Sequence, residues 1–211
     1  MNEIKVKICG ITREEDALMA IRHGAHAIGF VFCASARRVP ISIAKAIAGK
    51  IPKSVELIGV FADNSIADIL AISDSVGLTG VQLNGKEDSD FARALKEERP
   101  KLNVIKTISV KSPDSFADLE DFASDLVILD SPREPEPISP RSPLDLELVR
   151  QYRPQRPFFI AGGLTPWNVG DYVKALSPAG VDVSSGVESS PGIKDETAVR
   201  SFIYKLRGVA K

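Results

Sequence analysis

Short apolar runs alternate with longer amphipathic segments from one end of the chain to the other. The short runs have the composition of buried strands, and in the longer segments apolar residues recur at the spacing of one helix face. The predicted strands are residues 5–9, 27–32, 56–61, 80–83, 104–108, 126–130, 158–161 and 181–184. The predicted helices are residues 12–23, 41–50, 66–75, 91–98, 115–122, 144–151, 168–176 and 197–206.

Eight strands, each followed by a helix, predict an α/β fold, a single (β/α)8 (TIM) barrel, in a chain of 211 residues. A doubly wound open sheet is the alternative, because alternation alone does not show that a sheet closes. No shift in composition divides the chain, so we expect one domain over residues 1–211.

One predicted connection, residues 131–143, has an unusual composition because it contains five prolines. Proline has no N–H group and a fixed φ, so such a segment resists both helix and strand. We therefore expect an extended loop over the mouth of the barrel.

The composition is that of a water-soluble globular protein, with 44% hydrophobic residues, 26% charged residues and a formal net charge of −1. A nearly neutral chain does not attract nucleic acid or an acidic membrane surface, so we expect neither as a partner. The apolar segments are too short to span a bilayer, and the first residues lack an apolar signal core. These features predict a cytoplasmic protein.

Cysteine and histidine are scarce, with two of each in the chain. Two cysteines are too few for a disulfide framework, and their spacing to histidine is not that of metal ligands, so we expect no metal site. His23 and His26 fall on the amino side of the predicted barrel. Candidate chemistry is therefore sought at the carboxyl ends of the strands, where reacting groups collect in this fold.

The first such candidate is Cys9, in the segment Lys7-Ile8-Cys9-Gly10-Ile11-Thr12. The segment predicts a strand that ends at the thiol, a short turn, and a helix N-cap at Thr12. A thiol at that position can exchange a proton near neutral pH if its pKa is low enough. An isolated cysteine is also commonly a small buried hydrophobe, and we interpret Cys33 in that way.

Two further candidates are charged. Asp130 directly follows a buried apolar strand, where a carboxyl group can act as a general acid, although a loop-fixing aspartate is the alternative. Arg37 lies beyond the second strand and can grip a carboxylate through two hydrogen bonds. A solvated loop charge is the other interpretation of Arg37, and we expect it for the adjacent Arg38.

Glycine and serine cluster after the last two strands, at Gly162-Gly163 and at Ser184-Ser185-Gly186. Glycines let the backbone approach an anion closely, and the loops after strands 7 and 8 commonly bind phosphate in this fold. Each motif alone is equally explained by turn geometry. Their occurrence on adjacent loops favours a phosphate site.

A family resemblance extends over nearly the whole chain. Its segments are Lys7 to Thr12, Gly29-Phe30-Val31-Phe32, Ser35-Ala36-Arg37, Gln82-Leu83-Asn84-Gly85, Leu129-Asp130, Ala161-Gly162-Gly163-Leu164, and Asp182-Val183-Ser184-Ser185-Gly186-Val187-Glu188. Together they resemble phosphoribosylanthranilate isomerase, a (β/α)8 enzyme of tryptophan biosynthesis. The resemblance implies an Amadori rearrangement of an aminoribose phosphate, without a metal or an organic cofactor.

The resemblance also implies roles for individual residues. Cys9 would be the general base and Asp130 the general acid, while Arg37 would hold the anthranilate carboxylate. Asp182 would hold a substrate hydroxyl or help to order the mouth. Asn84, also expected to contact substrate, stands where the family usually has histidine.

The largest departure from the family lies in the proline-rich segment, where the family has a glycine-rich run leading into Phe-Asp-Trp. Prolines cannot donate to a phosphate as such a loop can. Glu134 and Glu136 would repel an anion if they pointed inward, and the candidates to compensate are Arg133, Ser139, Arg141 and Ser142.

Two other functions fit the same residues. One is isomerisation of a related ribosyl phosphate, of the histidine-pathway type, although that chemistry generally uses two aspartates and Cys9 stands in place of one. The other is a phosphate-ligand binding protein that has lost turnover. A monomer and a homodimer are both compatible with the sequence.

Overall fold

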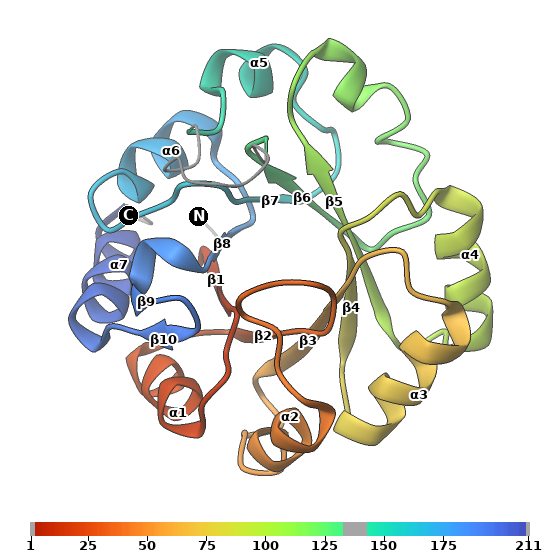
Figure 1. The fold of residues 1–211 in the computed structure, drawn as a ribbon. Helices are drawn as coiled ribbons and strands as arrows, with labels where there is room; N and C mark the ends of the chain where they lie inside the picture. The colour runs from red at the N-terminus through yellow and green to blue at the C-terminus, as the bar shows by residue number, and fades with distance from the viewer. Residues whose placement is uncertain (1–2, 133–142, 210–211) are drawn as a thin grey trace.

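The computed structural model describes residues 3–132 and 143–209 and shows a closed barrel of eight parallel strands. Each strand pairs with the next along the chain, and β8 pairs with β1. The helices surround the strands on the outside (Figure 1). The predicted (β/α)8 barrel is therefore confirmed, and the open sheet is excluded.

The strands of the barrel are β1 Lys5–Cys9, β2 Ala27–Val31, β3 Glu56–Phe61, β4 Gly80–Leu83, β5 Asn103–Ser109, β6 Leu126–Asp130, β7 Phe158–Ile160 and β8 Gly180–Val183. The α-helices are α1 Glu14–His23, α2 Ile41–Ala48, α3 Ile66–Val76, α4 Ser89–Glu98, α5 Leu146–Gln151, α6 Val169–Leu176 and α7 Glu196–Val209. Two short 3₁₀ helices, η1 Pro113–Phe116 and η2 Ser185–Val187, follow β5 and β8. A hairpin of β9 Glu188–Ser190 and β10 Ile193–Lys194 precedes α7.

The predicted helix at residues 115–122 is wrong, because only the 3₁₀ helix η1 forms between β5 and β6. The segment carries Asp118, Glu120 and Asp121 toward what would be the carboxyl end of a helix. Negative charges at that end oppose the helix dipole. The apolar spacing therefore did not suffice to form an α-helix.

The predicted N-cap at Thr12 is also wrong. Arg13 occupies the N-cap position of α1 without a side-chain cap bond. The Thr12 hydroxyl instead donates to the carbonyl of Gly192, at 2.6 Å, in the turn of the β9–β10 hairpin. A contact across 180 residues thus replaces the local one, and the hairpin itself was not predicted.

The apolar core has two parts, inside and outside the barrel. Outward-facing side chains of the strands, such as Ile8 and Phe30, are buried under the helices. Inside the barrel, Ile58, Ile105 and Ile128 form a separate apolar cluster. Since side chains alternate along a strand, the residues next to Ile8 on β1 face the interior.

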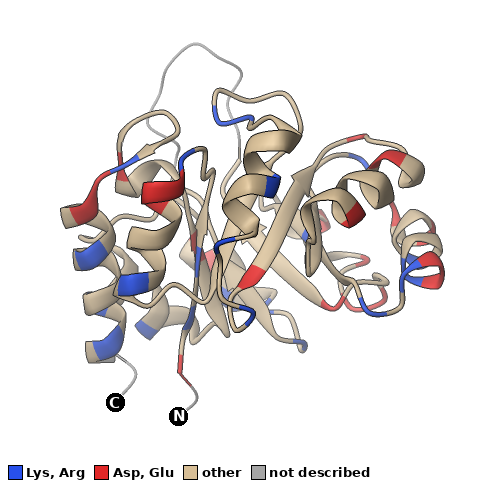
Figure 2. Ribbon diagram, turned by 90° about the horizontal axis from the view of Figure 1, so that it is seen from below, with Lys and Arg blue, Asp and Glu red and all other residues tan. Residues whose placement is uncertain are grey.

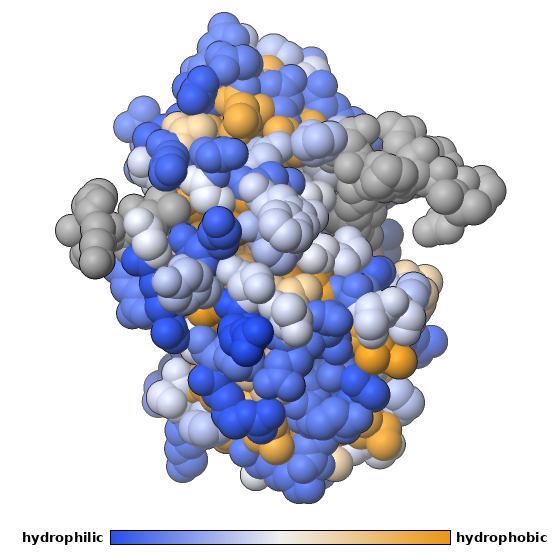
Figure 3. Space-filling model, turned by 90° about the vertical axis from the view of Figure 1, so that its left-hand side faces the viewer, coloured by the Kyte–Doolittle hydropathy of each residue, from blue (hydrophilic) through white to orange (hydrophobic). Residues whose placement is uncertain are grey.

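The outer surface carries charged residues of both signs on the helices and loops (Figure 2). The face shown in Figure 3 is mostly hydrophilic, with apolar residues scattered across it. Within the described ranges, no helix is both long and apolar enough to cross a membrane.

Substituting Gly180 with alanine tests how tightly the barrel interior is packed. A Cβ on Gly180 would meet the ring of Phe159 and would lie 2.7 Å from the carbonyl oxygen of Lys5. We expect Gly180→Ala to lower the free energy of unfolding by about 1–3 kcal/mol, because overpacking displaces backbone. Urea denaturation measures this change.

The matched control is Gly208→Ala in α7, where an added Cβ meets nothing within 4 Å. Alanine there should leave stability unchanged or raise it by up to about 1 kcal/mol, since alanine favours helix. Equal effects of the two substitutions would contradict the packing argument.

Candidate functional site

A cavity of about 380 Å³ opens at the carboxyl ends of the barrel strands. Its volume is in the range of small-molecule sites. It is lined by all ten residues that the sequence singles out, which are Cys9, Arg37, Asn84, Asp130, Gly162, Gly163, Asp182, Ser184, Ser185 and Gly186. Closure of the sheet thus brings together residues that are widely separated in the sequence.

Cys9 is the last residue of β1 and is 9% exposed. Burial raises the pKa of its thiol above the ordinary value, because the opposing effect of the nearby Lys7 ammonium is smaller. Lys7 itself is only 1% exposed, and its Nζ donates to Oδ1 of Asp182 at 2.9 Å. The candidate base therefore lies beside a buried ion pair that the sequence alone does not predict.

Asp130 ends β6 and is buried at the same cavity. Its backbone carbonyl accepts a hydrogen bond from the Val110 N–H at 2.9 Å, which fixes the strand end against the chain after β5. Asp130 also lines a smaller side pocket of about 220 Å³ together with Lys111 and Ser131. The carboxyl group thus lines the same cavity as Cys9, on a strand that β7 and β8 separate from β1.

Asn84 follows β4, in a loop held by buried charges. Lys106 donates to the carbonyl of Gly85 at 2.8 Å and pairs with Glu87 at 3.3 Å. Oδ1 of Asn84 is buried and has no hydrogen-bond partner among the described residues. Buried polar atoms are normally satisfied, so this oxygen is available to a donor group of a ligand or to water.

Arg37 forms a bidentate pair with Glu188. Its Nε donates to Oε1 of Glu188 at 2.9 Å and its Nη2 donates to Oε2 at 2.7 Å. The buried Lys194 ammonium donates to the same carboxylate at 2.7 Å. Burial raises the pKa of Glu188, but its bonds to the two cations outweigh burial and leave that pKa lowered. Burial lowers the pKa of Lys194. The cluster of Arg37, Lys194 and Glu188 still has two basic side chains and one acidic side chain, so this part of the rim can attract an anionic group of a ligand.

Glu188 and Lys194 were assigned no role from the sequence. Glu188 belongs to a segment of the family resemblance, but its partners become visible only when the hairpin folds back over the barrel. Lys194 lies on β10 within that hairpin. No local sequence signal indicates its position.

Backbone conformation and close packing explain the glycines after β7 and β8. Gly162 and Gly163 have φ of +87° and +63°, in the left-handed region that favours glycine. A Cβ on Gly186 would overlap the carbonyl oxygen of Leu164. The two loops therefore touch through their backbones at this point.

Cys33 differs from its predicted interpretation as a buried hydrophobe, since it is only partly buried and lines the cavity. It follows the last residue of β2 by two positions, at the rim, where packing is incomplete. Arg38 is exposed, as expected. The segment 133–142, with the residues named above for repelling or holding an anion, lies outside the described residues.

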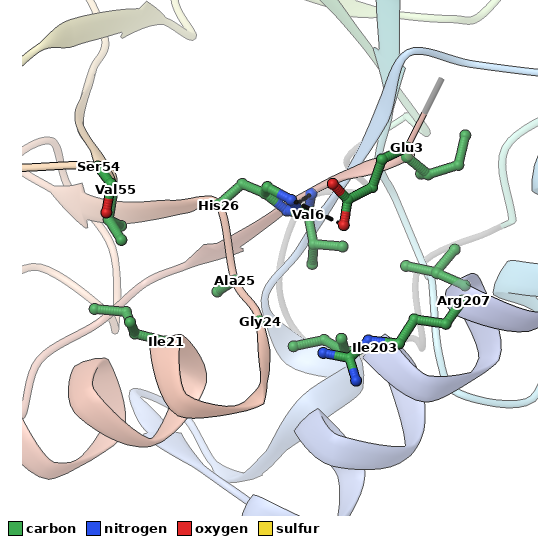
Figure 4. Close-up of a pocket in the computed structure, with 12 residues that line it drawn as sticks. Glu3, Val6, Ile21, Gly24, Ala25, His26, Ser54, Val55, Ile203 and Arg207 are labelled. Carbon is green, nitrogen blue, oxygen red and sulfur yellow. Dashed lines mark hydrogen bonds and ion pairs between the residues drawn. The ribbon is translucent and has the colours of Figure 1, made fainter. Parts of the chain in front are cut away.

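A second cavity, of about 330 Å³, lies at the amino end of the barrel between α1 and α7 (Figure 4). Both ring nitrogens of His26 have partners in this cavity. Its Nδ1 accepts a hydrogen bond from the Val6 N–H at 3.1 Å, and its Nε2 lies 3.5 Å from Oε1 of Glu3. Across residues 3–132 and 143–209, no group of three or more His, Cys, Asp or Glu residues could hold a metal ion. The candidate acid Asp130, the thiol of Cys9 and the guanidinium of Arg37 lie together at the carboxyl end of the barrel instead.

Comparison with known proteins identifies the same family as the sequence motifs. The profile of the family described as N-(5′phosphoribosyl)anthranilate (PRA) isomerase matches residues 6–205. The N-(5′-phosphoribosyl)anthranilate isomerase of Nostoc punctiforme is 37% identical over 206 residues, covering 96% of this chain and 98% of that protein. The corresponding protein of Rubrobacter xylanophilus is 40% identical and covers 94% of this chain and 97% of its own length.

Solved structures with the same fold belong to the same family. The phosphoribosyl anthranilate isomerase of Thermotoga maritima has a TM-score of 0.89 at 36% identity, covering 97% of this chain and 99% of that one. A phosphoribosyl anthranilate isomerase in complex with reduced 1-(o-carboxyphenylamino)-1-deoxyribulose 5-phosphate has a TM-score of 0.86 at 34% identity, with the same coverage. With matches of fold and sequence over nearly its full length, the chain belongs to the phosphoribosylanthranilate isomerase family.

Proposed function

We propose that this chain catalyses the isomerisation of N-(5′-phosphoribosyl)anthranilate to 1-(2-carboxyphenylamino)-1-deoxyribulose 5-phosphate in tryptophan biosynthesis. The observation that carries the proposal is that Cys9 and Asp130, a base and an acid of suitable chemistry, line one cavity in a member of this family. The solved relative binds a reduced form of the product, which has a carboxylate, a hydroxylated chain and a phosphate.

In the first step of the proposed reaction, Asp130 acts as the general acid and the ribose ring opens. Asp130 in its protonated form donates a proton to the ribose ring oxygen, and the C1–O bond breaks as the nitrogen lone pair forms a C1=N iminium. The aspartate is left as a carboxylate beside the new hydroxyl group. Burial at the end of β6 shields this carboxyl group from bulk solvent.

In the second step, Cys9 acts as the general base. The Cys9 thiolate takes the proton from C2, the C–H electron pair becomes a C1=C2 bond, and the iminium electrons return to nitrogen. The resulting enolamine tautomerises to the ketone by gaining a proton at C1 and losing one from the C2 hydroxyl. No oxidant, reductant or other co-reactant enters the balance.

The remaining groups orient the substrate. Arg37, already aligned by Glu188, faces the anthranilate carboxylate, and the backbone of the loops at Gly162-Gly163 and Ser184-Ser185-Gly186 faces the phosphate. Asp182 and Asn84 line the space between and accept from substrate hydroxyls.

The same proposal includes a cytoplasmic location and a monomer or homodimer. A Thermotoga maritima relative, described as a dimeric isomerase, has been solved as monomers generated from it. The phosphorylated ligand of the solved relative supports a small phosphorylated substrate.

Replacing the two proposed proton-transfer residues tests the function directly. We expect Cys9→Ala and Asp130→Asn each to lower kcat about 10²–10⁴-fold, because each removes one general acid–base contribution. The wild-type gene should restore growth of a tryptophan auxotroph that lacks this isomerase, and the purified protein should convert the substrate. Cys33→Ala, at the rim, should stay within about threefold of wild type. Full activity of both Cys9 and Asp130 variants would contradict the assignment.

Arg37 can be tested against its neighbour Arg38. Arg37→Lys loses the guanidinium that Glu188 holds through Nε and Nη2 and that leaves Nη1 for the substrate carboxylate, so we expect KM to rise about tenfold or more, with a smaller change in kcat. Arg38→Lys, on the exposed side of the same loop, is the matched control and should leave both constants unchanged. Steady-state kinetics of the two variants test this expectation. Equal KM values for the two variants would contradict the assignment of Arg37 to the substrate carboxylate.

A further inference from the structure

The interior of the barrel below Cys9 contains a buried ion pair that the two proton transfers above do not use. Lys7 and Asp182 are register partners on β1 and β8, and Nζ and Oδ1 are 2.9 Å apart. Their exposed fractions are 1% and 8%. Burying two charges costs solvation energy that an apolar pair of similar size would not require. Stability alone therefore does not explain a lysine at this position.

The geometry around Gly29 shows what Lys7 approaches. A Cβ on Gly29 would lie 2.8 Å from Sγ of Cys9 and 3.0 Å from Nζ of Lys7. The sulfur and the ammonium thus occupy the space over one glycine of the neighbouring strand β2. The missing side chain of Gly29 leaves room for both groups, and the two distances place Nζ and Sγ within about 6 Å of each other.

The ammonium of Lys7 stays charged in this setting. Burial lowers the pKa of Lys7, but attraction by Asp182 and by Cys9 outweighs burial, so that pKa lies above its ordinary value. Burial leaves the pKa of Cys9 above its ordinary value, and the charge and the hydrogen bond of Lys7 limit that rise. Lys7 therefore favours the form of the thiol that can accept a proton.

Other charged groups face the thiol from neighbouring elements. Asp182 on β8 raises the pKa of Cys9, and Lys194 on β10 lowers it. Arg37 is attracted to Cys9 but is paired with Glu188, and Asp130 on β6 faces the same cavity. Among these groups, the attraction of Lys7 is the largest opponent of burial.

We propose that Lys7 is a positioning residue of the isomerase, whose ammonium, anchored by Asp182, stabilises the thiolate form of Cys9 at the cavity against the effect of burial. The inference rests on the proposed function, in which Cys9 accepts the C2 proton. During that step the proton passes from carbon to sulfur, and Lys7 keeps its own protons because Asp182 binds them. Lys7 thus acts through Cys9 and does not touch the substrate.

The test measures the pH midpoint at which the Cys9 thiol ionises in the free enzyme. In a Cys33→Ser background Cys9 is the only remaining cysteine, and the pH dependence of its alkylation by iodoacetamide gives the midpoint of thiolate formation. Lys7→Met should move that midpoint up by about one pH unit, a tenfold smaller thiolate population at a given pH. The acid limb of the kcat/KM profile should move in the same direction. Lys5→Met, which removes an exposed lysine of the same strand, is the matched control and should leave the midpoint in place.

A second variant covers the case in which Lys7→Met leaves Asp182 unpaired and fails to fold. Lys7→Met/Asp182→Asn removes both charges, and its midpoint should still rise, by less than in the single variant. A folded variant of either kind with an unchanged midpoint would overturn the role of Lys7. Absence of isomerase activity in the wild type, with the midpoint shift intact, would instead overturn the proposed function.

Discussion

Pairing of β1 with β8 is the constraint on which the site depends, because it closes the barrel. The register sets Lys7 beside Asp182, which are 175 residues apart in the sequence. All eight strands are parallel, so closure brings their carboxyl ends to one rim. Cys9 at the end of β1 and Asp130 at the end of β6 then line a single cavity.

The interior of the barrel contains an apolar layer and a charged layer. The apolar layer contributes to stability, and the charged layer lies beside the reacting groups. The cluster of Ile58, Ile105 and Ile128 is apolar and supplies buried area that favours folding. Lys7 and Asp182, below the thiol, instead form a charged pair that costs solvation energy. A fold stabilised by its apolar layers can carry such a pair, which sets the electrostatic environment of Cys9.

The sequence predicts the barrel well because strand and helix periods are local properties. Residues 5–9, 56–61, 80–83 and 126–130 form strands with the predicted bounds, and polar residues at strand ends meet as the topology requires. The sequence does not predict contacts made across the closed structure. Thr12 binds the turn of a distant hairpin, and Lys194 reaches Glu188 only after that hairpin folds back. The partner of Lys7 is likewise fixed by closure.

The most direct test of the account is a crystal structure of this protein with the reduced product analogue bound. If Cys9 is the base and Asp130 the acid, Sγ of Cys9 should lie within about 3.5 Å of C2, the distance of a near-attack contact. The carboxyl group of Asp130 should lie within hydrogen-bond reach of the hydroxyl group that derives from the ribose ring oxygen. A ligand whose C2 faces away from Cys9, with its carboxylate far from Arg37, would contradict the account.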